Sequence, residues 1–193
     1  MGRPGGRLHD QLAGMPLVDH HCHGVVSRQL DRTGLEALLT EAPEAGPPGT
    51  SPFDSLLGVA VRRWCAPLLD LPAHAPPDDY VQRRLELGGR AVARRFLTAT
   101  GASDLLLDVG LGAGELLGPD EMAAISGART HRVVRLETVA EGVAAGTSGA
   151  DFAAAFEDAL TRQLRGAVAV KSIAAYRGGL ALDPRPPGLA EVD

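Results

Sequence analysis

Apolar and polar positions follow different patterns in the two halves of the chain, and the second half carries the clearer one. Short runs rich in Leu and Val occur at residues 104–109, 131–137 and 167–171. Runs of this length and composition predict strands that are buried on both faces, as in parallel sheets. Segments with helical spacing lie between them, at residues 119–126, 138–145 and 151–164. Alternating strands and helices predict a parallel sheet with right-handed crossovers.

A further strand is predicted at residues 16–20, where Leu17 and Val18 lead into a polar cluster. We interpret residues 1–14 as a flexible lead-in and residues 15–193 as one domain. Residues 25–100 show helical patterns only, including a helix that begins at Ser51 and one that begins at Pro77 and bends at Gly88. The predicted fold class is therefore α/β, with about four parallel strands and a helical insertion at residues 25–100 after strand one.

A histidine cluster follows the first predicted strand. Three of the six histidines fall within four positions, beside Asp19. Side chains alternate along a strand, so Asp19, His21 and His23 share one face. Two imidazoles two residues apart on one face can chelate a single divalent cation. We expect them at or just beyond the end of a buried strand; the other interpretation is a surface loop with incidental histidines.

Polar residues also end the other predicted strands, where parallel β/α barrels carry their functional groups. Asp108 either caps the Gly-rich loop that follows it or belongs to a site. Arg135 and Glu137 share one face of the predicted third strand, where they either form an ion pair or contact a ligand. Lys171 is the one lysine beside 18 arginines. It is therefore a candidate for chemistry that a guanidinium cannot perform.

The run from Asp19 to His23 resembles the Asp-x-His-x-His signature on the first strand of the amidohydrolase superfamily. Residues 134–138, 170–173 and 175–180 extend the resemblance to the amidohydrolase-related group, which includes the domain found fused to glutamine synthetase. Those proteins are TIM-type (β/α)8 barrels with one or two divalent metals at the C-terminal ends of the strands. A complete barrel typically needs about 250 residues. The resemblance therefore implies a partial barrel, the N-terminal half.

The resemblance also implies roles for individual residues. His21, His23 and Lys171 are the implied metal ligands, with Zn²⁺ as the expected cation. In dinuclear members the lysine at the position of Lys171 is carboxylated, which requires a neutral amine, and bridges two metals; an uncarboxylated Lys171 would instead pair with a substrate carboxylate or with Glu137. Either way Lys171 is a candidate catalytic residue. The implied substrate contacts are Arg135, Glu137, Tyr176 and Arg177, with packing as the alternative for the last two.

The implied reaction is hydrolysis of a C–N, amide-like bond in a small-molecule substrate by a metal-activated water. The family's remaining ligands and its catalytic aspartate lie on later strands, so we expect the chain to be truncated and incomplete, with residues 25–100 as a lid over the metal end. Whether the chain is an active enzyme by itself is left open. The alternatives are a non-catalytic remnant acting, if at all, through protein contacts, and a metal-dependent non-oxidative decarboxylase of the same superfamily.

The composition of the chain limits which classes of partner are expected. The net charge is −5 and the arginines are scattered among acids, so no nucleic-acid partner is expected. Two cysteines do not make a disulfide framework, which favours a cytoplasmic location. No apolar run approaches the ~18 residues of a membrane span, so no membrane partner is expected. An open half-barrel would expose apolar edges, which favours a homo-oligomer or a complementing C-terminal half.

Overall fold

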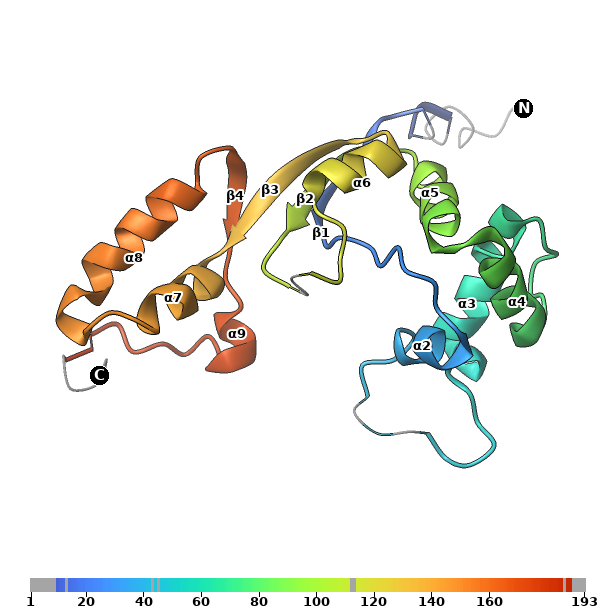
Figure 1. Ribbon diagram of the computed structural model, residues 1–193, viewed down its shortest axis with the longest axis horizontal. Helices are drawn as coiled ribbons and strands as arrows, with labels where there is room; N and C mark the ends of the chain where they lie inside the picture. The colour runs from blue at the N-terminus through green and yellow to red at the C-terminus, as the bar shows by residue number, and fades with distance from the viewer. Residues whose placement is uncertain are drawn as a thin grey trace, which may run out of the picture. The chain divides into compact units, whose positions relative to one another are not determined.

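The computed structural model describes residues 10–12, 14–42, 44, 46–111, 114–185 and 187–188. The chain divides into two compact units. The sheet unit comprises residues 1–24, 103–123 and 128–193 as far as they are described, and the helical unit comprises residues 25–102 and 124–127. The elements of both are shown in Figure 1. The placement of residues 25–100 as a lid over the strands stays a prediction.

The sheet unit is built on one four-stranded sheet in the order β1-β2-β3-β4. Its strands are β1 (Leu17–Cys22), β2 (Ala102–Asp108), β3 (Arg129–Arg135) and β4 (Ala167–Lys171). Strand β3 pairs in parallel with both β2 and β4, with Asp108 opposite Val133 and Arg135 opposite Lys171. The predicted α/β class with about four parallel strands is therefore confirmed. The sheet is open, with β1 and β4 at its edges, which is consistent with part of a barrel.

Helices connect these strands in the alternation that the sequence predicts (Figure 1). They are α6 (Pro119–Ser126), α7 (Leu136–Ala144), α8 (Gly149–Gln163) and, after β4, α9 (Ala174–Arg177). Helix α7 packs against α8. The buried apolar side chains of the sheet unit come mainly from the two central strands and from α6 and α7: Leu105, Leu107, Met122, Val133, Val134 and Val139. No helix in the described part of the chain is long and apolar enough to cross a membrane.

Strand β1 differs from its prediction in extent and in burial. It continues to Cys22, so His21 lies within the strand and His23 directly follows it. The expectation of a buried strand is wrong, because the side chains of Leu17 and Val18 are 55% and 57% exposed. The physical reason is the position of β1 at an edge of an open sheet, where a neighbouring strand borders it on one side only.

Strand β3 ends earlier than its apolar run predicts. It stops at Arg135, and Leu136 begins α7, so Glu137 lies in the first turn of a helix. The prediction that Arg135 and Glu137 share one strand face is therefore wrong. Leu136, Val139 and Val143 have helical rather than strand spacing, which explains why the chain turns directly into a helix.

The helical unit contains α2 (Arg32–Ala37), η1 (Pro52–Asp54), α3 (Leu56–Trp64), η2 (Pro67–Leu69), α4 (Pro77–Leu87) and α5 (Gly89–Ala99). Ser51 caps the short 3-10 helix η1, and Ser55 caps α3, so the helix predicted from Ser51 begins in two steps. Phe53 and Tyr80 are fully buried in its core and meet edge to face, with ring centroids 6.1 Å apart. The bend expected at Gly88 is a complete break between α4 and α5.

Gly88 adopts φ +81° and ψ 148°, a combination that only glycine reaches readily. Gly88→Ala is therefore expected to lower the free energy of unfolding by about 1–3 kcal/mol in urea denaturation. Gly142→Ala is the control, because Gly142 is exposed within α7 and an added Cβ there would meet nothing within 4 Å. The control should be neutral or stabilising by up to ~1 kcal/mol. Equal losses in both variants would contradict the backbone argument.

Candidate metal centre

Two imidazoles and a carboxylate converge at the C-terminal ends of β1 and β2. His21, His23 and Asp108 each offer one ligand atom, and these atoms all lie within 4.8 Å of one another. The two imidazole rings have centroids 5.3 Å apart and stand at 83° to each other. Asp108 is the last residue of β2, the strand beside β1. The strand ends therefore bring together residues about 85 positions apart in the chain.

The backbone around the cluster orients both histidines. His23 Nδ1 lies 3.1 Å from the backbone carbonyl oxygen of Asp108. In the tautomer with the proton on Nδ1, this nitrogen donates to the carbonyl and Nε2 keeps its lone pair, which is the usual arrangement of a metal-binding histidine. The backbone N–H of His21 donates to Asp19 Oδ1 at 3.2 Å. Asp19 thus supports the backbone of the signature.

Asp108 is held as a carboxylate. Its side chain is fully buried, Oδ1 accepts the Gly110 N–H at 2.9 Å, and Oδ2 accepts from Arg135 Nη2 at 2.6 Å and Lys171 Nζ at 3.1 Å. Burial alone would raise the pKa of Asp108, but the donors from Arg135, Gly110 and Lys171 outweigh burial and lower this pKa to about 2. Asp108 therefore both caps the following loop and belongs to the cluster, the two roles that the sequence left open.

Lys171 joins the cluster from β4. Its Nζ lies 2.9 Å from His21 Nε2. An ammonium group can only donate, so the imidazole of His21 accepts through Nε2. Burial, followed by the positive charge of Lys171 and the neighbouring His23, lowers the pKa of His21 against an opposing effect of Asp108. The neutral form of His21 is therefore favoured, which is the form that can bind a metal.

Glu137 lies beside this cluster without pairing with its cations. Its Oε1 accepts from the Ser172 hydroxyl and from the Ile173 N–H at 2.9 Å. Among the described residues, Oε2 is buried and has no hydrogen-bond partner. The structure thus pairs Arg135 and Lys171 with Asp108 instead of with Glu137.

The remaining predicted contacts lie on α9. Tyr176 is 89% exposed, and Arg177 Nη2 forms an ion pair with Glu141 Oε1 of α7 at 3.1 Å. Their roles as substrate contacts stay predictions, as does that of Arg135. Asp108 is the residue that sequence reasoning did not commit to. The available signal was its position as a polar residue at the end of an apolar strand in a parallel sheet.

No protein-family model matches the chain, and no curated protein matches it with significant similarity. A solved structure does match: a protein from Lactobacillus casei ATCC 334, described as a candidate metal-dependent hydrolase, with 25% sequence identity and a TM-score of 0.66. The match covers 91% of this chain and 46% of the other, so this chain spans less than half the length of that protein. The likeness supports the fold of a metal-dependent hydrolase for this chain.

The donor set suits a divalent cation. Imidazole nitrogens and a carboxylate oxygen are ligands that Zn²⁺ and other borderline cations accept. The carbonyl that holds His23 Nδ1 is the kind of outer partner that metal-binding histidines have. The residues His21, His23 and Asp108 therefore form a candidate site for a divalent cation.

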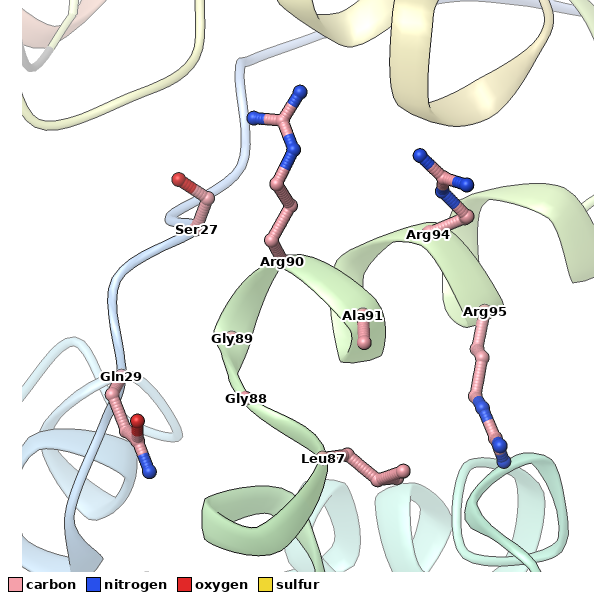
Figure 2. A pocket seen from close by; sticks show the side chains of 9 residues that line it. All are labelled: Ser27, Gln29, Leu87, Gly88, Gly89, Arg90, Ala91, Arg94 and Arg95. Atoms are coloured by element: carbon pink, nitrogen blue, oxygen red, sulfur yellow. The ribbon is translucent and has the colours of Figure 1, made fainter.

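A cavity of about 660 Å³ lies elsewhere, within the helical unit. Figure 2 shows it between the segment of Ser27 and Gln29 and the start of α5. Arg90 and Arg94 point to one side of α5, while Arg95 points to the other and pairs with Asp70 at 2.8 Å. None of the candidate metal ligands lines this cavity. The candidate metal centre is instead formed at the strand ends of the sheet unit.

Proposed function

We propose that this chain binds a divalent cation, with Zn²⁺ as the expected ion, through His21, His23 and Asp108. We further propose that it forms part of a metal-dependent hydrolase of amidohydrolase type. The convergence of two imidazoles and an ionised carboxylate at the C-terminal ends of parallel strands carries the proposal. The Lactobacillus casei neighbour supports the hydrolase assignment. A cation bound here would supply Lewis acidity toward a carbonyl group.

The chain's own residues would prepare the site for that chemistry. Arg135 is almost fully buried, with a side chain 10% exposed, and its guanidinium binds Asp108 through both Nε and Nη2. We assign it to holding Asp108 ionised and in place. We also propose an amide-like substrate, with a C–N bond as the bond cleaved, which rests on the resemblance of the run from Asp19 to His23 to the amidohydrolase signature.

Turnover would require further strands. The edge strand β4 exposes Val168 and Val170, with side chains 56% and 49% exposed. A parallel sheet is normally covered on both faces, so we propose that additional β/α segments complete it, from a longer chain, a complementing partner or a second copy. Decarboxylation, a non-catalytic role and a cytoplasmic location stay predictions.

The proposal is tested by loading the purified chain with metal. Metal-free protein is dialysed against Zn²⁺, Co²⁺ or Mn²⁺, and the bound metal is measured by mass spectrometry. Each loaded sample is then assayed with chromogenic amides and esters. About one cation per chain is expected from the one ligand cluster found among the described residues. Binding below that level with every cation would contradict the proposed metal site, and binding without turnover would favour the need for further strands.

A further inference from the structure

We propose that the Lys171 ammonium is a resident cation of the candidate metal centre, which a divalent cation must displace. The inference rests on the proposed function, because it concerns the same ligands. Lys171 Nζ lies 2.9 Å from His21 Nε2 and 3.1 Å from Asp108 Oδ2. It therefore contacts two of the three residues that would hold the cation, one from β1 and one from β2.

The contact with His21 makes the two cations mutually exclusive. An imidazole nitrogen has one lone pair, and His21 Nε2 uses it to accept the hydrogen bond from Lys171. That lone pair cannot bind a metal at the same time. The proton of this neutral imidazole is then on Nδ1, so neither ring nitrogen is a free ligand until the bond to Lys171 breaks.

Electrostatic repulsion at Asp108 also prevents Lys171 and a divalent cation from occupying the site together. Its Oδ2 already accepts from Arg135 at 2.6 Å in addition to Lys171. A divalent cation close to this oxygen would meet an ammonium and a guanidinium at short range, beside a carboxylate that is fully buried, so water screens the repulsion between these like charges only in part. Arg135 is almost fully buried and bound through two nitrogens, whereas the Lys171 side chain is 24% exposed. Lys171 is therefore the cation that can leave.

Two different roles follow for the metal-free and the loaded chain. In the metal-free chain Lys171 neutralises Asp108 together with Arg135 and ties β4 to β1 and β2. On loading, it swings out and the cation takes over the contact with Asp108. The amidohydrolase resemblance implies the opposite role for this lysine, because there it binds the metal instead of competing with it. The two roles predict opposite effects of removing Lys171.

The test is Lys171→Met, which keeps an unbranched side chain and removes the charge. Zn²⁺ affinity is measured by competition with a chromophoric chelator, and the Co²⁺-loaded absorption spectrum reports on the ligands. The Zn²⁺ dissociation constant of K171M should fall by at least about tenfold, because a site that the ammonium leaves free no more than about a tenth of the time binds metal about tenfold more weakly. Metal-free K171M should melt at a lower temperature than metal-free wild type, and Zn²⁺ should raise its melting temperature by more than that of wild type.

Arg132→Met controls for the loss of one positive charge, because Arg132 lies on β3 and its Nη2 donates to Gln163 of α8 and not to a candidate metal ligand. Its Zn²⁺ affinity should stay within about twofold of wild type, as expected for a surface charge. An unchanged or weaker affinity in K171M overturns the inference and leaves the metal site standing. Binding by K171M alone supports the inference and overturns the proposed function of the native chain. Binding by neither protein overturns both.

Discussion

Replacing His21 and His23 together with alanine is expected to abolish stoichiometric binding of a divalent cation. The two imidazoles are two of the three donors that converge, so the remaining Asp108 carboxylate, already bound by Arg135 and Lys171, cannot hold a cation alone. The dissociation constant for Zn²⁺ should rise by more than about 100-fold, since loss of residues that merely orient metal ligands already costs roughly 10–100-fold. Isothermal titration calorimetry on metal-free protein measures this change.

The matched controls are His20→Ala and His131→Ala, each with one imidazole removed. His20 lies on β1 on the face opposite to His21 and His23. His131 lies on β3 and pairs with Asp104 of β2 at 2.9 Å. Both variants should bind Zn²⁺ as the wild type does. A double variant that still binds one cation per chain, or a His131→Ala variant that loses it, would place the metal elsewhere.

Local patterns were enough to predict the sheet. The apolar run at residues 167–171 coincides with β4, and the runs at 104–109 and 131–137 lie within two residues of β2 and β3 at each end. Burial was not predictable in the same way. A run such as Leu17-Val18 indicates that a strand can be buried, but whether it is depends on neighbours supplied by other elements, and β1 has a strand on one side only.

The sequence indicated which residues are candidates for the site, but not which of them form ion pairs with one another. Strand alternation placed His21 and His23 together, and the C-terminal ends of parallel strands placed Lys171 and Asp108 near them. The partner of each charge depends on register and on where β3 ends. Because the chain turns into α7 at Leu136, Arg135 faces Asp108 while Glu137 turns toward Ser172. No spacing in the sequence distinguishes that outcome from an Arg135–Glu137 pair.

Asp108→Asn is expected to lower the free energy of unfolding by about 3–5 kcal/mol, because it leaves the nearly buried Arg135 without its counter-charge. Asparagine keeps the shape of the side chain and one acceptor, so the loss reports on charge more than on packing. Urea denaturation at neutral pH measures this loss of stability.

The stabilisation that Asp108 contributes in the wild type depends on pH in a defined direction. The folded pKa of Asp108 is about 2 against an ordinary 3.8, so its stabilisation is fully present above the ordinary value and is lost as the pH falls toward about 2. The variant should lack that part of the acid sensitivity.

Asp104→Asn on the same strand is the control, and the comparison separates burial from pairing. Asp104 accepts from Arg129 at 2.7 Å and from His131, and its pKa is lowered, first by the hydrogen bonds from Arg129 and then by that from His131. The Arg129 side chain is 75% exposed, however, so water can solvate it when its partner is lost. We therefore expect Asp104→Asn to lower the free energy of unfolding by clearly less than Asp108→Asn does. If the two variants lose equal stability, burial of Arg135 is not what makes Asp108 important, and the cluster would then be held together by its hydrogen bonds alone.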